Sequence, residues 1–338
     1  MRLSFFIFLL FLFFHSFIGF SQDWIQLGLD IDSEFPSDQS GYSVSSNSDG
    51  TIVAIGAPIN DLQGSNRGHV RIYQWNNGRW AQLGADIDGD YAQGNSGSSV
   101  SLSSDGTIVA IGAPNANTKG IVRVYQYANN TWTKLGSDID GEGNGDEFGR
   151  SISLSSDGTK VAIGAPMNDG SGTASDNRGH VRVYGYSNNS WTKLGSDIDG
   201  EASNDRSGTS VSINSDGTKV AIGAPNNDGV KGHVRVYEYA NNSWTQLGAD
   251  IDAVVRLADR FGTSVSLSND GTKVAIGATQ KTAGASQKGY AQIYDYSNNT
   301  WTKIGSDIDG EGNGDDFGHS ISLSRDGTKV AIGGYLNE

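Results

Sequence analysis

The sequence contains no cysteine, only five prolines, and fewer basic than acidic residues. The absence of cysteine excludes a disulfide-stabilised scaffold, metal sites built from thiolates and catalysis by a thiol. The net charge of −14, from 24 basic and 38 acidic residues, argues against nucleic acid as a partner, because phosphates require a basic surface. Glycine is abundant instead, at 47 of 338 residues, and with serine, asparagine and aspartate it indicates many turns between many short strands.

The sequence has one long hydrophobic run, and it lies at the N-terminus. Arg2 precedes an unbroken apolar stretch at 5–14, and Gly19 and Ser21 place small residues at positions −3 and −1 of a cleavage site before Gln22. This pattern is typical of a secretory signal peptide, whereas a transmembrane anchor needs about 20 apolar residues. We therefore predict a signal peptide at 1–21 and a repeat domain at 22–338 without a transmembrane span, located outside the cell as a secreted or surface protein.

The repeat domain is one unit that recurs about every 55 residues. Six tryptophans mark the copies, at spacings of 56, 52, 59, 53 and 57 residues: Trp24, Trp80, Trp132, Trp191, Trp244 and Trp301. A copy holds four candidate strands with alternating apolar residues, which in the third copy fall at 151–155, 160–165, 180–186 and 191–198. Asp157-Gly158 and Asn188-Asn189 lie between pairs of these segments and predict tight hairpin turns.

Four short antiparallel strands cannot bury both faces of their sheet alone, so the units must stack. Stacking around an axis gives a β-propeller, and the alternative is a linear β-solenoid. We predict an all-β propeller of four-stranded antiparallel blades with six visible copies, the last one incomplete. The chain starts with a lone fourth strand at 24–31 and ends with two strands at 320–332. Either the closing blade has three strands or, as we expect, the chain is a fragment of a seven-bladed ring.

Two short motifs in each copy resemble the FG-GAP repeat of integrin α subunits and secreted microbial proteins. Phe-Gly stands at 148–149, 261–262 and 317–318, and Gly-Ala-Pro stands at 56–58, 112–114, 164–166 and 223–225. The resemblance covers residues 24–338 and implies seven blades, adhesion or ligand binding, and calcium. The link between the two motifs is only Ser-Ser-Asp-Gly-Thr at 155–159, too short for the calcium loop that the family carries there. This turn also resembles TolB-type propellers, a weaker match that leads to the same architecture.

An acidic pattern at positions 1, 3, 5 and 9 occurs in a different link, between the fourth strand of one copy and the first strand of the next. Calcium prefers six to eight oxygen ligands, and carboxylates spaced by two along a tight loop can supply several. The pattern also fits Asp30, Asp32, Glu34 and Asp38. The candidate calcium ligands are Asp138, Asp140, Glu142, Asp146, Asp197, Asp199, Glu201, Asp205, Asp307, Asp309, Glu311 and Asp315.

The same acids have two other interpretations. They can end the strand and cap the turn. They can also pair with an arginine that recurs in the third strand, at Arg71, Arg123, Arg182 and Arg235. Strand order places the acidic links at the same end of the domain as the loops of most variable length, at 59–67, 115–119, 167–178, 226–231 and 279–288. Such a face is typical of a binding surface, although loop length also drifts where nothing constrains it.

Nearly every polar residue belongs to the repeat, so the asymmetric constellation that catalysis needs is not evident. We therefore predict no enzyme and no cofactor other than calcium. The recurring His69, His180 and His233 are expected to be structural, and the tryptophans to form the core between blades. The predicted function is binding of an extracellular protein or polysaccharide in adhesion or recognition. The alternatives are a glycan-processing enzyme with its site at the central channel, and a structural spacer.

Overall fold

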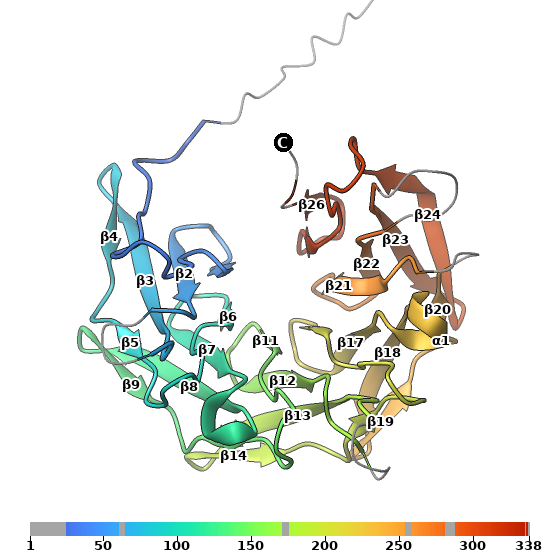
Figure 1. Ribbon diagram of the computed structural model, residues 1–338, viewed down its shortest axis with the longest axis horizontal. Helices are drawn as coiled ribbons and strands as arrows, with labels where there is room; N and C mark the ends of the chain where they lie inside the picture. The colour runs from blue at the N-terminus through green and yellow to red at the C-terminus, as the bar shows by residue number, and fades with distance from the viewer. Residues whose placement is uncertain are drawn as a thin grey trace, which may run out of the picture.

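The computed structural model describes residues 25–60, 65–170, 176–253, 258–280, 288–334 and 336. Six β-sheets follow one another along the chain and stand side by side in an arc around a central axis, as propeller blades do (Figure 1). Neighbouring strands within each sheet are antiparallel, which confirms the predicted all-β architecture with an incomplete last copy. The predicted signal peptide at 1–21 lies outside the described residues. Within the described ranges, no helix has the length and apolarity needed to cross a membrane.

The sheets are nearly identical in their element bounds. The first contains β1 (Ser43–Ser46), β2 (Ile52–Ala57), β3 (His69–Asn76), β4 (Arg79–Gln82) and β5 (Ile87–Asp88). The second contains β6 (Ser99–Leu102), β7 (Ile108–Ala113), β8 (Ile121–Ala128), β9 (Thr131–Lys134) and β10 (Ile139–Asp140). The third contains β11 (Ser151–Leu154), β12 (Lys160–Ala165), β13 (His180–Ser187), β14 (Ser190–Lys193) and β15 (Ile198–Asp199).

The later sheets follow the same plan. The fourth contains β16 (Ser210–Ile213), β17 (Lys219–Ala224), β18 (His233–Ala240), β19 (Ser243–Gln246) and β20 (Ile251–Asp252). The fifth contains β21 (Phe261–Leu267), β22 (Lys273–Ala278), β23 (Tyr290–Ser297) and β24 (Thr300–Asp309), and the sixth contains β25 (Ser320–Leu323) and β26 (Val330–Gly333). Two single turns of helix, η1 (Ala116–Thr118) and α1 (Asn227–Val230), lie in loops between the second and third strands.

The predicted continuous fourth strand at 191–198 is wrong in the third sheet, where it is split into β14 and β15. The split falls at Gly195, which has a φ of +72°, a conformation that glycine adopts easily. The backbone leaves the strand there because the carbonyl of Leu194 accepts a hydrogen bond of 2.8 Å from the indole N–H of Trp244 in the next sheet. The first, second and fourth sheets are split in the same way, whereas β24 is continuous in the fifth.

The two glycine motifs meet across each junction between sheets. A Cβ atom on Gly164, in the third sheet, would lie 2.1 Å from the carbonyl oxygen of Gly208, which precedes the first strand of the fourth. Only a residue without a side chain fits this contact. The same contact recurs at Gly56, Gly112, Gly223 and Gly277. The pairing of the motifs in sequence therefore reflects close packing of backbone on backbone.

Serines of the first strand fasten each sheet to the next. The hydroxyl of Ser151 donates a hydrogen bond of 2.8 Å to the carbonyl of Gly208, and the hydroxyl of Ser153 accepts one of 3.1 Å from the backbone N–H of Ile213. The turns after these strands bond to one another as well: the N–H of Ser104 donates to Ser156, and that of Ser156 to Ser215. The series starts at Ser48 and continues through Asn269 to Arg325, so the first strands form the inner wall of the arc.

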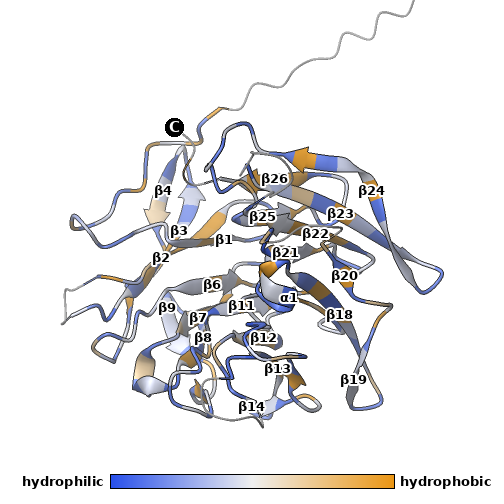
Figure 2. Ribbon diagram, turned by 45° about the vertical axis from the view of Figure 1, so that its right-hand side comes forward, coloured by the Kyte–Doolittle hydropathy of each residue, from blue (hydrophilic) through white to orange (hydrophobic). Residues whose placement is uncertain are grey.

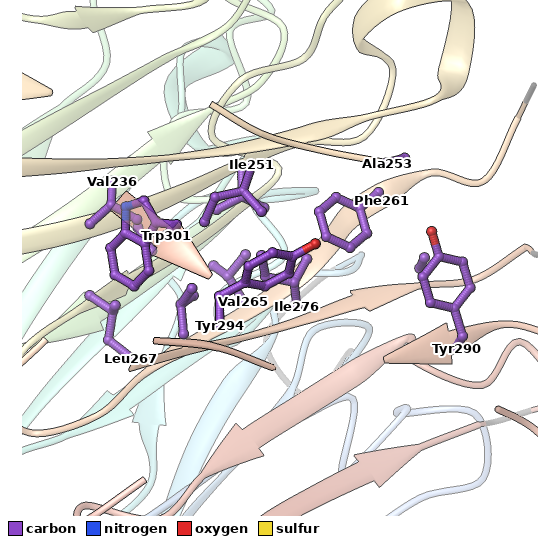
Figure 3. Close-up of a cluster of buried hydrophobic side chains, with 14 residues drawn as sticks. Val236, Ile251, Ala253, Phe261, Val265, Leu267, Ile276, Tyr290, Tyr294 and Trp301 are labelled. Atoms are coloured by element: carbon purple, nitrogen blue, oxygen red, sulfur yellow. The ribbon is translucent and has the colours of Figure 1, made fainter. Parts of the chain in front are cut away.

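The hydrophobic core lies between neighbouring sheets. Figure 3 shows the cluster between the fourth and fifth sheets, where Val236 and Ile251 of the fourth meet Phe261, Tyr294 and Trp301 of the fifth. Its tryptophan ring is 9% exposed. Three further clusters of buried, mostly aliphatic residues lie at the other junctions among the first four sheets, each with a tryptophan packed against it. Trp132, Trp191, Trp244 and Trp301 are thus junction residues, as predicted, whereas Trp24 lies outside the described residues.

Some apolar side chains near the two ends of the arc remain exposed. Ile25 and Leu29 are 87% and 88% exposed at one end, and Ile304 is 44% exposed on β24 at the other, where Figure 2 marks hydrophobic positions. A Cβ atom on Gly41 would meet nothing within 4 Å, although its counterpart Gly97 is tightly packed. A closing blade of three strands would require 24–31 to pair with the strands at 320–332, and among the described residues β25 and β26 pair only with each other.

Candidate functional site

The two sets of longer loops lie together at one end of the sheets, as predicted. The N–H of Gly145, in the link after the second sheet, donates a hydrogen bond of 2.7 Å to the carbonyl of Thr118, in a loop between second and third strands. The N–H of Asn204 bonds in the same way to Asp176, at 2.6 Å. We call this end the loop face. The opposite end has short turns, and parts of three of the variable loops, at 61–64, 171–175 and 281–287, lie outside the described residues.

The acids at position 1 of the links pair with basic side chains of their own sheet. Asp197 accepts hydrogen bonds from Arg182 at 2.8 Å and Lys193 at 2.5 Å. Burial opposes ionisation, but these two donors outweigh it and lower the pKa of Asp197 to about 2. Asp138 is held in the same way by Arg123 and Lys134, and Asp307 by Gln292 and Lys303.

The acids at position 5 reach across the junction to the next sheet. Glu142 pairs with Arg182, so this guanidinium joins a link residue to Asp197 of its own sheet. Burial raises the pKa of Glu142, but the hydrogen bond from Arg182 outweighs that effect and the pKa falls below its usual range. The same bridge is made by Glu34 and Arg71, Asp90 and Arg123, and Glu201 and Arg235.

The acids at position 9 are buried, and each accepts a hydrogen bond from a backbone N–H group of its own link. Asp146 is 5% exposed and accepts hydrogen bonds from the N–H of Gly143 at 2.9 Å and the amide of Asn168 at 2.8 Å. Asp205 accepts from Ala202 at 2.8 Å, and Asp315 from Gly312 at 2.6 Å. The acids at position 3 lie on exposed strand ends, at Asp140, Asp199 and Asp309.

The candidate calcium ligands of one link are therefore directed to different partners. Among the described residues, no link brings three of its own carboxylates within 4.8 Å of one another. In the first four sheets an arginine pairs with the acid at position 5 of the preceding link, and in the first three sheets it also pairs with the acid at position 1. The acids at positions 1 and 5 therefore pair with the recurring arginines, as the alternative interpretation proposed. The four acids of one link do not converge on a common point.

Three buried histidines lie beside these ion pairs, and the sequence did not indicate this arrangement. His180 lies with Glu142 and Asp197, and one ligating atom from each falls within 4.8 Å of the others. Burial and the neighbouring Arg182 both lower the pKa of His180, so the ring is neutral at pH 7. The equivalent groups are Glu34, His69 and Asp86, and Glu201, His233 and Asp250. The atoms of such a group can ligate a metal ion. In the groups of His180 and His69, however, both carboxylates already pair with an arginine, Arg182 or Arg71.

The loop face has two adjoining hollows at the junction of the first and second sheets. The outer hollow, of about 560 Å³, lies between the loop that follows β2, the link after β5 and the loop that contains η1. Five carboxamide side chains line it together with Tyr91: Asn66, Gln93, Asn95, Asn115 and Asn117. The inner hollow, of about 190 Å³, shares Asn95 and Asn115 with the outer one and extends to Tyr42, Glu147 and Arg150.

The hollows arise where the second link departs from the repeat. Tyr91 stands where the third and sixth sheets are preceded by Gly143 and Gly312, and Asn95 stands where they have Glu147 and Asp316. The buried aspartate of position 9 is replaced by Gly94. The sequence of this link has acids at positions 1, 3 and 5, at Asp86, Asp88 and Asp90, but none at position 9. The sequence did not show that the loops on both sides would supply further amides to the same hollow.

Solved structures of low sequence identity share this fold. One is a "putative 6-phosphogluconolactonase" from Bacteroides uniformis, with a TM-score of 0.60 and 13% identity over 86% of this chain and 77% of that chain. Another is hydrazine synthase from Kuenenia stuttgartiensis, with a TM-score of 0.56 and 12% identity over 92% and 77%. No family model matches the sequence, and no curated protein matches it. The likeness establishes a β-propeller-like fold.

One prediction is corrected by this comparison. From the uniformity of the repeats we predicted that the chain is not an enzyme. Proteins with enzyme names share the architecture, at 13% and 12% identity, so a repeated propeller does not by itself exclude catalysis. The prediction also assumed that no asymmetric polar site exists, whereas the two hollows are built from residues that differ between copies.

Proposed function

We propose that this protein is an exported binding module that recognises an extracellular partner, protein or glycan, through its loop face, in adhesion or surface recognition. The observation that carries the proposal is the asymmetry between the two ends. One end gathers the variable loops and two hollows of about 560 and 190 Å³, and the other consists of short turns that bond to one another. Insertions collected on one face of a repeat protein are typical of a binding surface.

The finer resemblance to FG-GAP repeats supports the same proposal. Its two motifs form a physical unit here, since Gly164 packs on the backbone of Gly208 and four further pairs repeat the contact. This unit stabilises the junctions at the strand ends next to the loop face, and the loops beyond it differ in length between copies. The predicted signal peptide at 1–21 places such a module outside the cell.

The proposal is tested by blocking each face in turn. Ala92 is exposed in the outer hollow, so Ala92→Arg fills part of that hollow with a long charged side chain. Ser190 is exposed at a turn of the opposite face, and Ser190→Arg is the matched control. Binding of the intact protein to immobilised extracellular matrix proteins and polysaccharides should be lost with Ala92→Arg and kept with Ser190→Arg. Equal binding by both variants would show that the loop face is not the binding surface.

A further inference from the structure

The outer hollow between the first and second sheets has a lining that differs chemically from the rest of the molecule. The chain carries a net charge of −14, yet none of the described residues that line this hollow has a formal charge. The neutrality comes from two replacements in the second link, because Gly94 and Asn95 stand where the next link has Asp146 and Glu147. A neutral lining neither repels an uncharged ligand nor attracts an ion.

The lining has the hydrogen-bonding capacity that a hydroxyl-rich ligand requires. A carboxamide carries two N–H donors and one carbonyl acceptor, so an exposed one can bond to two adjacent hydroxyl groups at once. The amide of Asn95 already donates to the carbonyl of Pro58 and accepts from Asn115. Gln93, Asn115 and Asn117 are exposed to solvent at the hollow, and Asn66 and Asn95 are half-buried in its wall. A binding site built to bond hydroxyl groups discriminates strongly against ligands that lack them.

An aromatic side chain completes the arrangement. Tyr91 is 38% exposed beside the amides, and the guanidinium of Arg123 lies 5.8 Å from the centre of its ring. A ring held in this way offers one apolar surface next to polar groups, which suits the mixed apolar and hydroxylated faces of a sugar ring. A second exposed tyrosine, Tyr42, borders the inner hollow, and the shared Asn95 and Asn115 connect the two.

Backbone hydrogen bonds hold the lining loops in place before any ligand binds. The N–H of Gln93 donates to the carbonyl of Ser65 at 2.7 Å, and that of Asn95 to Asn66 at 3.1 Å. The side chain of Asn115 donates to that of Asn95 at 2.7 Å. These bonds join three chain segments into one wall, which reduces the entropy lost on binding.

We propose that the hollow between the first and second sheets binds a neutral glycan, with one sugar ring against Tyr91 and its hydroxyl groups bonded to the surrounding carboxamides. The chain of sugars continues past Asn95 and Asn115 toward Tyr42. This inference rests on the proposed function, since it names the ligand class of the loop face.

The experiment is affinity electrophoresis of the full-length mature protein in gels that contain a neutral polysaccharide: an α-glucan, a β-glucan, a mannan, a xylan or a galactan. At least one of these should retard the protein, and Tyr91→Ala should weaken that retardation at least tenfold. Tyr91→Phe keeps the ring and should stay within a few fold of the parent protein. Asn115→Asp removes two donors and adds a charge, and it should weaken binding comparably. Thr131→Ala, at an exposed turn of the opposite face, should change nothing.

Treatment of the immobilised matrix separates this inference from the broader proposal. Periodate destroys vicinal diols of glycans, and protease destroys proteins. Binding that periodate removes supports the glycan inference. Binding that only protease removes, and that Ala92→Arg abolishes, would retain the loop-face function but overturn the glycan. Retardation by an anionic polysaccharide alone, retardation that Tyr91→Ala leaves unchanged, or no retardation in any neutral gel would also overturn it.

Discussion

At the scale of single residues, one arginine in each of several junctions performs two tasks. Arg182 neutralises Glu142 from the preceding link and Asp197 from its own sheet, and its side chain is 9% exposed. Burial lowers the pKa of His180, and the charge of Arg182 lowers it further. The guanidinium group therefore neutralises carboxylates of the acidic links from within the protein.

Replacing this arginine should make stability depend less on pH. The folded protein depresses the pKa of Asp197 to about 2, so the paired carboxylate contributes stability above its ordinary pKa and loses it as the pH falls toward 2. Arg182→Ala should lower the free energy of unfolding by about 1–2 kcal/mol at pH 7, a value reduced because solvent partly screens these ion pairs. The difference from the parent protein should narrow as the pH falls from 5 to 3. Removing Arg182 also makes His180 easier to protonate in the folded state, so the variant loses less stability than the parent protein on acidification. This effect narrows the difference in stability as well.

Urea unfolding at a series of pH values measures this difference. The exposed Arg79, changed to alanine, is the matched control and should give a small offset that does not vary with pH. A gap between Arg182→Ala and the parent protein that stays constant or widens on acidification would contradict the ion-pair explanation.

At the scale of strands, the junction depends on a glycine whose backbone angles are ordinary. Gly164 is not in the left-handed region, so alanine would meet no backbone strain there, but its Cβ atom would lie 2.1 Å from the carbonyl oxygen of Gly208 and 2.4 Å from the hydroxyl of Ser151. Gly164→Ala should therefore lower the free energy of unfolding by about 1–3 kcal/mol through overpacking. Gly333 is the equivalent residue of β26, where a Cβ atom would meet only the side chain of Ser320.

The two glycines form a matched pair for thermal or urea unfolding. Gly333→Ala should be neutral or slightly stabilising, because alanine reduces the entropy of the unfolded chain. If both variants lost the same stability, the cause would be local strand geometry and not contact with the next sheet.

The strands that the sequence predicted best are those whose pattern is set locally. The second strand at 160–165 matches β12, because alternating apolar residues and the Asp157-Gly158 turn act within one hairpin. The fourth strand was mispredicted because its interruption depends on Trp244, which lies 50 residues from its acceptor Leu194. The acidic links show the same limit. Their spacing was evident and Arg182 was one of the alternative partners, but Asn168, which bonds to Asp146, comes from a variable loop that spacing cannot reveal.

At the scale of the whole molecule, the location outside the cell remains a prediction. When the protein is expressed with its own N-terminus in a secreting host, N-terminal sequencing of the exported product should begin at Gln22. Ser21→Leu places a bulky residue directly before the cleavage site and should leave the precursor uncleaved. Intact Met1 on soluble protein that stays inside the cell would contradict the prediction.

The contact of glycine with backbone also bears on how such a molecule can grow. Each of the first four junctions is made mostly by groups that the copies share: a glycine carbonyl, two serine hydroxyls, a backbone N–H and an indole. Any copy can therefore follow any other without new complementary substitutions, and a duplicated copy joins the array already fitted to its neighbours. Only the loops on one face then distinguish one copy from the next. The junction chemistry makes the array modular, so recombination between copies would rearrange the loop face while leaving the scaffold intact.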